Sequence, residues 1–240
     1  KGLDKIALGK ADFVVTGAID DIGVESVIGF GNMNATANSE EMYGKGIDAR
    51  FFSRANDRRR GGFLESQGGG TILVTRGDIA EAGLPVAAVV GFIHSYADGA
   101  HTSIPAPGLG AWLPASVQDS KLVHDLASSA FSDDIAVVSK HDTSTNANDP
   151  NESELHNTLA HAIGRTDGNP LFVISQKTLT GHAKGGACIS INGLTQLFKS
   201  GVIPANASLD CVDPKLQRDD IWSGSRKALA IGGGEDEFGR

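Results

Sequence analysis

Two histidines, each placed directly after an apolar segment, are the residues of this chain best suited to chemistry. His141 closely follows the apolar run 135–138, and His182 follows the apolar run 171–174 after the turn 175–181. Short apolar runs of this kind are typical of buried strands. The separation of the histidines suits one strand–helix–strand unit, which would carry both to the same edge of a parallel sheet, where α/β proteins bind ligands.

The residues after His182 indicate how this second histidine is positioned. Four of the five residues 183–187 are Gly or Ala, at the start of a helix that we expect to begin near His182. A glycine inside a helix costs about 1 kcal/mol relative to alanine. A cluster of them therefore predicts that another part of the backbone passes close by. Lys177 lies on the same strand-to-helix turn, beside the partial positive charge of a helix N-terminus.

Three sequence segments together resemble a known enzyme family. They are Lys-His-Asp-Thr-Ser-Thr at 140–145, Asn-Asp-Pro-Asn-Glu at 148–152 and Ser-Gln-Lys-Thr-Leu-Thr-Gly-His at 175–182. These segments resemble the two histidine motifs of a β-ketoacyl synthase (ketosynthase). Within that family, the sequences of these motifs are most similar to the ketosynthase domain of type I fatty acid synthases of the bacterial and fungal kind. The resemblance runs along nearly the whole chain.

The resemblance implies an α/β fold of the thiolase type, with α/β/α/β/α layers, that is incomplete at both ends. Alternating strand and helix patterns support the α/β class independently. Residues 1–240 would then form part of one ketosynthase domain. We expect residues 1–97 to hold the end of its N-terminal half and the crossover, and residues 98–240 to hold the C-terminal half with both histidines.

A ketosynthase joins two acyl groups by a decarboxylative Claisen condensation. Malonyl on an acyl carrier protein loses carbon dioxide, and the resulting carbanion attacks an acyl thioester held on a cysteine. By resemblance, His141 and His182 would hold the enolate oxygen as neutral N–H donors, a contribution typically worth a few kcal/mol for each donor. Lys177 would favour the enolate charge, and the family carries a glutamate at the position of Glu152 that pairs with this lysine as structural support.

The resemblance also implies a substrate arm and partners. Thr143 and Thr145 match threonines that hydrogen-bond the phosphopantetheine arm of an acyl carrier protein. We expect no cofactor to be bound by the domain itself, because the substrate is carried on that phosphopantetheine. The expected partners are the acyl carrier protein domain, malonyl and acyl thioesters, other synthase domains and further copies in a homo-oligomer.

The nucleophilic cysteine of the family is not found among these residues. By resemblance it would lie just upstream of Lys1, and the family's Gly-Phe-Gly loop is missing after residue 231. Cys188 is best interpreted as a small buried apolar residue. We therefore expect this fragment of a larger chain to be inactive alone. The alternative is a non-catalytic thiolase-fold scaffold or a protein that binds acyl carrier protein.

Composition excludes several other functions. The formal net charge of −8 argues against nucleic-acid binding as a main task. No apolar run approaches the roughly 18 residues of a membrane span, and the lack of a signal peptide makes the cytoplasm the expected location. His156 and His161 do not share a helix face as an i, i+4 pair would, so we expect no metal site.

Other sequence patterns predict local structure. Ser39 and Asp149 are predicted to be helix N-caps, and Glu152 lies three residues after Asp149, as in a capping box. The run 58–60 of three arginines is either a site for phosphate or an acidic partner, or a solvated turn with internal salt bridges, and we favour the turn. Glycines 68–70 are not followed by the Lys-Ser/Thr of a phosphate loop. Apolar periodicity predicts strands over 71–74 and 84–93 and a helix over 117–131.

Overall fold

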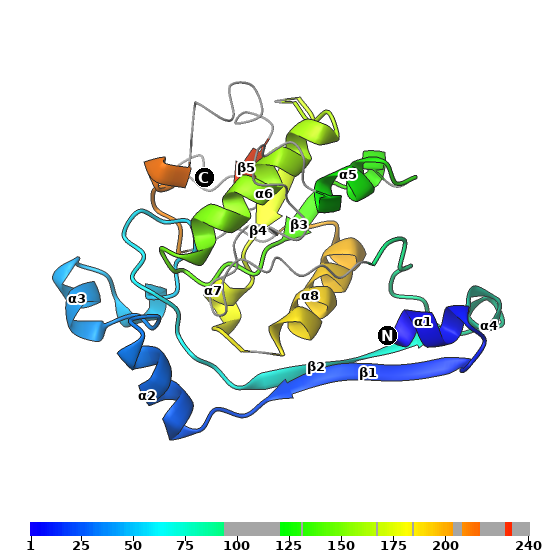
Figure 1. The fold of residues 1–240 in the computed structure, drawn as a ribbon, viewed down its shortest axis with the longest axis horizontal. Coiled ribbons are helices and arrows are strands. Elements are labelled where there is room, and N and C mark those ends of the chain that lie inside the picture. The colour runs from blue at the N-terminus through cyan, green and yellow to red at the C-terminus, as the bar shows by residue number, and fades with distance from the viewer. Residues whose placement is uncertain are drawn as a thin grey trace.

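The computed structural model describes residues 1–93, 121–130, 132–166, 168–183, 185–203, 208–216 and 229–231. Its strands form two sheets (Figure 1). Strand β1 (Phe13–Asp20) pairs with β2 (Gly68–Thr75) as a long antiparallel ribbon. Strands β3 (Val137–Ser139), β4 (Leu171–Ile174) and β5 (Leu229–Ile231) form a parallel sheet in that order.

Helices separate and cover these sheets. Helix α6 (Asn148–Ala162) connects β3 to β4, and the short helix α7 (Lys177–Thr180) and helix α8 (Gly186–Ser200) follow β4. Helix α8 packs on the β1–β2 ribbon, so it lies between that ribbon and the parallel sheet (Figure 1). The order of layers is therefore α6, parallel sheet, α8 and ribbon, which agrees with the layered α/β arrangement expected from the sequence.

The remaining helices are short and lie towards the edges of the structure. They are α1 (Gly2–Ala7), α2 (Val24–Asn32), α3 (Ser39–Gly44), α4 (Gly77–Glu81), α5 (Lys121–Ala127) and the 3-10 turns Ala49–Phe51, Ser132–Asp134 and Pro214–Leu216. Helix α3 is capped by the side chain of Asn38, which accepts a hydrogen bond from the Glu41 amide at 3.0 Å. The N-cap is thus one residue earlier than the expected Ser39.

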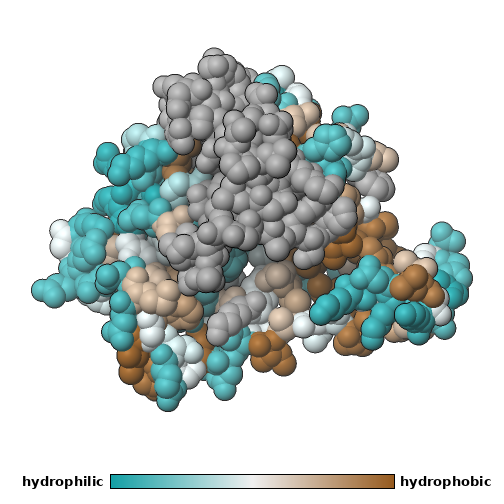
Figure 2. All heavy atoms as spheres, in the orientation of Figure 1, coloured by the Kyte–Doolittle hydropathy of each residue, from teal (hydrophilic) through white to brown (hydrophobic). Residues whose placement is uncertain are grey.

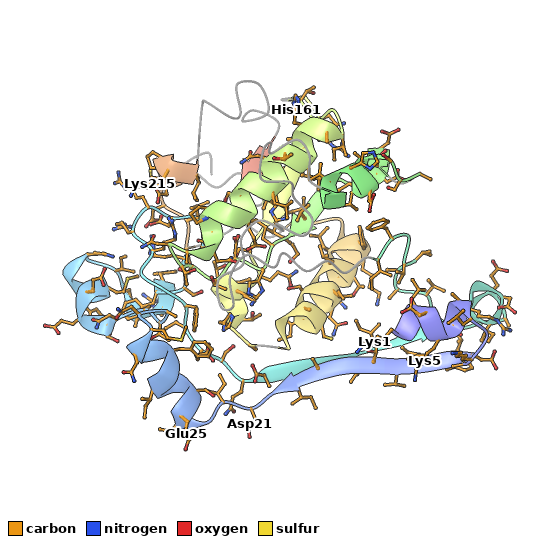
Figure 3. All side chains as sticks on the ribbon, in the orientation of Figure 1. Lys1, Lys5, Asp21, Glu25, His161 and Lys215 are labelled. Atoms are coloured by element: carbon orange, nitrogen blue, oxygen red, sulfur yellow. The ribbon has the colours of Figure 1, made fainter. Side chains whose placement is uncertain are left out.

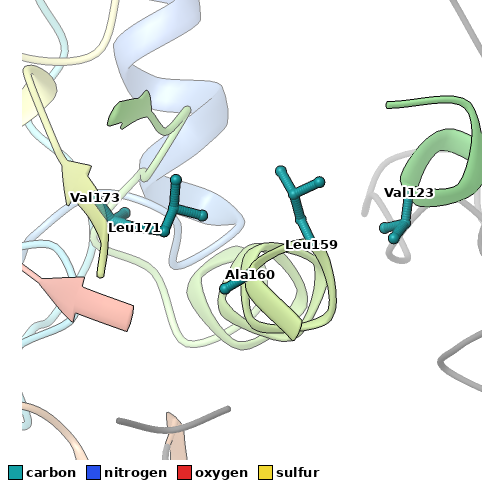
Figure 4. Packing of buried hydrophobic residues seen from close by; sticks show 5 residues of the cluster. All are labelled: Val123, Leu159, Ala160, Leu171 and Val173. Atoms are coloured by element: carbon teal, nitrogen blue, oxygen red, sulfur yellow. The ribbon is translucent and has the colours of Figure 1, made fainter. Parts of the chain in front are cut away.

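A small apolar core joins α6 to the parallel sheet. Leu159 and Ala160 of α6 are buried against Leu171 and Val173 of β4, with Val123 of α5 on the far side of the helix (Figure 4). Helix α6 therefore has apolar contacts on two sides. This packing fixes the direction of α6, and with it the loop that joins β3 to α6 and carries His141.

The predicted close approach of backbone near residue 185 is confirmed. A Cβ atom placed on Gly185 would lie 3.1 Å from the carbonyl oxygens of both Ala18 and Gly68. Glycine is favoured here because the start of α8 comes close to the backbone of both strands of the ribbon, and a side chain would force them apart. Glycines 68–70 lie in strand β2, which agrees with their being structural.

Two element predictions need correction or fall partly outside the described residues. Residues 84–93 form no strand, although Val86, Val89 and Val90 are apolar and exposed. An apolar run does not by itself distinguish a strand from a segment that presents apolar surface. Helix α5 occupies the middle of the predicted helix 117–131, while residues 117–120 and 131 lie outside the described part.

The surface carries both apolar and charged side chains near the ribbon. Val15 and Ile19 on β1 and Val24 on α2 are exposed, and Figure 2 shows hydrophobic side chains along the lower margin of this face. Figure 3 labels Lys1, Lys5, Asp21 and Glu25 near the ribbon and His161 and Lys215 away from it, and all six are exposed.

Candidate active site

The fold brings His141 and His182 together, as the sequence predicted. His141 follows β3, and His182 lies between α7 and α8 after the neighbouring parallel strand β4. The centroids of the two imidazole rings are 5.7 Å apart, and the ring planes are nearly perpendicular at 83°. The two histidines can therefore act on the same small group.

The backbone around His141 is held by the carboxylate of Glu152. One oxygen of Glu152 accepts a hydrogen bond from the His141 amide at 2.7 Å, and the other accepts from the Asp142 amide at 2.6 Å and from Asn148 Nδ2 at 2.8 Å. Glu152 was expected to pair directly with Lys177. The structure instead uses its oxygens to fix the His141 loop, and its charge reaches the lysine only over a longer distance, where it favours the ammonium form.

The direct neighbour of the Lys177 ammonium is His141. Nζ of this buried lysine lies 3.0 Å from Nδ1 of His141. An ammonium group can only donate hydrogen bonds, so Nδ1 of His141 accepts and a neutral His141 carries its proton on Nε2. Burial lowers the pKa of Lys177 to about 8. Burial of the imidazole lowers the pKa of His141, and the nearby charges of Lys177 and His182 lower it further, to about 4. The residue as a whole still keeps solvent access.

His182 has a carboxylate and an aromatic ring as neighbours. Its Nδ1 lies 2.8 Å from Oε1 of Glu65, whose side chain is 7% exposed. The imidazole stacks on Phe63 with the ring centroids 4.3 Å apart, and Phe30 approaches edge-on. Burial lowers the pKa of His182, and the hydrogen bond to Glu65 opposes that shift.

Sequence reasoning missed both Glu65 and Phe63. These residues lie in the loop before β2, far from either histidine motif in the chain. Backbone hydrogen bonds join this loop to the His182 turn: the His182 amide donates to the Leu64 carbonyl at 2.7 Å, and the Ser66 amide donates to the His182 carbonyl at 3.2 Å. The available sequence signal was an acidic residue beside apolar residues, and such a pattern does not indicate which side chain the acidic residue contacts.

Thr143 and Thr145 lie in the same loop as His141. Their hydroxyl oxygens are hydrogen-bonded to each other at 2.8 Å, and Thr145 Oγ1 also accepts from the Asn148 amide at 3.1 Å. Thr145 thus satisfies the backbone amide of the first residue of α6. A hydroxyl has one donor and two acceptor sites, so both threonines retain hydrogen-bonding capacity for a ligand.

The prediction that Asp149 caps α6 is wrong. The N-cap position is Ala147, and Asp149 is fully buried, where Oδ2 accepts from the Asn56 amide at 2.9 Å and lies 3.3 Å from Arg60 Nε. The contacts with Asn56 and Arg60 hold the carboxylate in the interior, away from the start of the helix. Asp149 is therefore part of an ionic network beneath the His141 loop.

That network, which we call the polar cluster, joins three stretches of the chain. Its members are Arg54, Asn56, Asp57, Arg60, Lys140, Asp142, Asp149 and Asp213, all of them buried. Arg60 Nη1 donates to Asp213 Oδ2 at 2.8 Å, and Lys140 Nζ lies 2.8 Å from Asp142 Oδ1. Within the arginine run 58–60, Arg59 and Arg60 make internal salt bridges, as favoured. Arg60 is buried, however, so the run is not the fully solvated turn that was expected.

The polar cluster also holds backbone that is unusual for residues with side chains. Asn56, Asp142 and Ser144 have φ angles of 65°, 21° and 64°. Non-glycine residues seldom adopt positive φ. Asn56 Nδ2 donates to Asp142 Oδ2 at 3.0 Å, and Ser144 Oγ accepts from the Arg54 amide at 3.0 Å. These contacts stabilise the tight turn that follows His141.

Within the described part of the chain, no group of three or more His, Cys, Asp or Glu side chains could hold a metal ion. Among the helices that the structure describes, none has the length and apolar character needed to cross a membrane.

Comparison with known proteins agrees with this geometry. The sequence profile of the β-ketoacyl synthase C-terminal domain matches residues 86–210. Fatty acid synthase 2 of Mycosarcoma maydis is 35% identical over 216 residues, which cover 89% of this chain and 6% of that protein. Fatty acid synthase subunit alpha of Saccharomyces cerevisiae is 28% identical, over 90% of this chain and 16% of that protein. The chain thus spans only a small part of these relatives.

A solved structure shows the same fold. The ketosynthase FabY from P. aeruginosa superposes with a TM-score of 0.78 and 26% sequence identity, over 98% of this chain and 36% of that one. A β-ketoacyl synthase from Burkholderia phymatum matches with a TM-score of 0.69 at 23% identity, over 89% of this chain and 48% of that one. The mixed α/β architecture is therefore the thiolase-like fold of ketosynthases. On the profile match, the two-histidine site and the fold together, this chain belongs to the β-ketoacyl synthase family and is homologous to fungal fatty acid synthase alpha subunits over about 90% of its length.

Proposed function

We propose that residues 1–240 supply the two-histidine half of a ketosynthase that carries out decarboxylative Claisen condensation within a fatty acid synthase. The observation that carries this proposal is the meeting of His141 and His182, with their ring centroids 5.7 Å apart and a buried ammonium 3.0 Å from His141. Donors held in place before reaction stabilise charge that develops in the transition state. In this reaction that charge develops on the thioester oxygen of malonyl as carbon dioxide leaves.

Each residue has a role that fits its contacts. The Lys177 ammonium lies 3.0 Å from Nδ1 and 3.5 Å from Nε2 of His141. The shorter contact makes Nδ1 the acceptor, so the proton is on Nε2, which can donate to the enolate oxygen. Glu152 supports this arrangement by holding two amides of the His141 loop. Thr143 and Thr145, in the same loop, are assigned to the phosphopantetheine arm that brings in malonyl.

The partners follow from the same proposal. Malonyl and acyl groups would arrive as thioesters on an acyl carrier protein domain, beside other synthase domains and in a homo-oligomer. The solved AntDE:AntF complex contains an acyl-carrier protein together with its ketosynthase. The thioester-forming cysteine is assigned to sequence outside these 240 residues, which cover between 36% and 52% of the matched ketosynthase chains. Residues 1–97 are assigned to the end of the N-terminal half of that domain and the crossover, and residues 98–240 to its C-terminal half.

The test uses the complete polypeptide that contains this sequence. His141→Ala and His182→Ala should each abolish decarboxylation of a malonyl thioester while the nucleophilic cysteine still becomes acylated. Full decarboxylation by either variant would rule out the role of that histidine. The 240-residue piece alone should make no β-ketoacyl product, and product from it would contradict the assignment of the cysteine to another part of the chain.

A further inference from the structure

The two residues on either side of His141 turn their side chains into the interior, whereas His141 itself is exposed. Lys140 and Asp142 are each at most 2% exposed, and Lys140 Nζ lies 2.8 Å from Asp142 Oδ1. Burial opposes the charge of Lys140, but nearby carboxylates, Asp142 first among them, raise its pKa above the ordinary value. Burial raises the pKa of Asp142 to about 6, against the attraction of Lys140, so this carboxyl is ionised at neutral pH. His141 is therefore held between a buried cation and a buried anion.

The side chain of Asn56 bridges these two ions. Its Oδ1 accepts a hydrogen bond from Lys140 Nζ at 3.0 Å, and its Nδ2 donates to Asp142 Oδ2 at 3.0 Å. An ammonium only donates and an ionised carboxylate only accepts, so the amide fits this pair in one orientation. Together with the direct contact between Lys140 and Asp142, the two bonds close a ring of three side chains.

We propose that Asn56 is a positioning residue for His141, because its amide holds Lys140 and Asp142 together and with them the backbone that carries the imidazole. The catalytic meaning of this assignment rests on the proposed ketosynthase function. His141 is then fixed from two directions. Glu152 accepts the backbone amides of His141 and Asp142, and Asn56 holds the side chains of the two neighbours of His141.

The backbone of Asn56 is anchored independently of its side chain. Its amide donates to Asp149 Oδ2 at 2.9 Å, and its carbonyl accepts from the Asp213 amide at 2.9 Å. Its φ angle is 65°, a conformation that asparagine and aspartate adopt more readily than other residues with side chains. Asn56→Asp therefore keeps the backbone and the shape of the side chain, while it replaces the donor at Nδ2 by an acceptor and adds a negative charge.

An exchange of two side chains separates this bridge from general damage to the fold. Asn56→Asp alone places two carboxylates face to face, and Asp142→Asn alone leaves Lys140 without its carboxylate partner. The double variant Asn56→Asp/Asp142→Asn restores each contact of the ring with the central bond reversed. The new amide at position 142 donates to the new carboxylate at position 56, an oxygen of each still faces Lys140, and the number of buried charges is that of the wild type.

The variants are made in the complete polypeptide that contains this sequence, and two rates are measured at neutral pH. These are acylation of the nucleophilic cysteine and decarboxylation of a malonyl thioester. Asn56→Asp and Asp142→Asn should each lower decarboxylation by about tenfold or more, since the loss of a hydrogen bond to a buried charged group has an effect on that scale, and should leave acylation nearly unchanged. The double variant should recover most of the decarboxylation rate, because residues in direct contact are coupled.

Asn34→Asp is the matched control. Asn34 is exposed and has a φ angle of 52°, so the same chemical change is made in the same region of backbone conformation but away from the ring. Both rates should stay as in the wild type.

Three results would overturn the inference. They are wild-type decarboxylation in Asn56→Asp, an equal fall of acylation and decarboxylation in that variant, and a double variant that is no better folded and no more active than the single variants. If Asn56→Asp does not fold, the double variant decides, because recovery of both the fold and decarboxylation is expected of it.

Hydrogen exchange of the peptide that contains His141 separates this inference from the proposed function. Exchange should be faster in each single variant and should return towards the wild-type rate in the double variant. A wild-type protein without decarboxylation would contradict the proposed function, and the exchange pattern would still decide whether Asn56 holds the His141 backbone. Wild-type decarboxylation together with unaltered exchange in Asn56→Asp would remove the Asn56 assignment and leave the proposed function standing.

Discussion

His141 and His182 reach the same place with different support. The His141 loop rests on the polar cluster, where buried ions and positive-φ residues are held by hydrogen bonds such as that from Asn56 Nδ2 to Asp142 Oδ2. The His182 turn rests on a stacked phenylalanine, one buried carboxylate and backbone hydrogen bonds to Leu64 and Ser66. The first support is ionic and the second is mainly aromatic and backbone in character.

This difference predicts different sensitivity to substitution. Removing one partner of a buried ion pair leaves a charge without compensation, which is strongly destabilising. Removing a stacked ring loses apolar contact and shape, a smaller effect. Removing one charge should therefore strongly destabilise the structure around His141. Substitutions around His182 should destabilise their surroundings less.

The largest expected effect is that of Arg60→Met. Arg60 is buried and bonds both Asp149 and Asp213, so its loss should destabilise the His141 side by about 3–5 kcal/mol. Hydrogen exchange of peptides covering the His141 loop and α6, measured by mass spectrometry in the intact protein, should become much faster. Arg59→Met is the matched control, because Arg59 is 36% exposed and its pair with Asp210 lies at the surface, where such pairs contribute about 1 kcal/mol or less. Equal effects of the two substitutions would contradict the ionic view of this side.

Glu152→Gln should have the next largest effect. The amide that replaces the carboxylate can accept fewer and weaker hydrogen bonds from His141 and Asp142, and hydrogen bonds to a charged group are worth about 1.5–3 kcal/mol. Malonyl decarboxylation by the full-length protein should fall by about tenfold or more on that energy scale. The exposed carboxylate of Glu40 provides the control, and Glu40→Gln should leave the rate unchanged. Wild-type activity in Glu152→Gln would show that these contacts do not position His141.

Phe63→Leu should weaken the His182 side by a smaller amount. The substitution removes the ring that stacks on His182 at 4.3 Å and retains much of the apolar volume. Aromatic pairs contribute about 0.5–1.5 kcal/mol beyond their buried area. Decarboxylation should fall severalfold, while hydrogen exchange in the His141 loop stays as in the wild type. Faster exchange in that loop would mean that the two supports are one cooperative unit.

How much of this could be predicted from the sequence depends on whether the cause is local. The apolar runs before His141 and His182 predicted two parallel strands and the meeting of the rings, because strand order follows from local patterns and short connections. The small residues near 185 predicted a close backbone contact, since a larger side chain would crowd it. Such features are encoded within a few residues of where they act.

The remaining features depend on distant partners. Asp149 resembled a helix cap because the helix follows it directly, but buried Arg60, far away in the chain, takes that carboxylate into the interior. Glu65 reaches His182 only because the ribbon packs under α8. The apolar run 84–93 had strand composition and forms no strand. For Asp149 and Glu65 the partner lies far away in the chain, and no local pattern records it.

The smallest expected effect, and the one most specific to His141, lies in the alkaline pH dependence. Burial lowers the pKa of Lys177 to about 8, so its ammonium is present below that pH and is lost as the pH rises through it. Above pH 8 the lysine no longer forces a proton onto Nε2 of His141, and malonyl decarboxylation should decline, to about half at the pKa.

Lys177→Arg keeps a cation at all accessible pH values, so its rate relative to its own maximum should stay flat between pH 7.5 and 9. Lys45→Arg, at a partly exposed pair with Glu41, should retain the wild-type profile. An identical decline in Lys177→Arg would assign the alkaline limb to another group and remove the lysine from the support of His141.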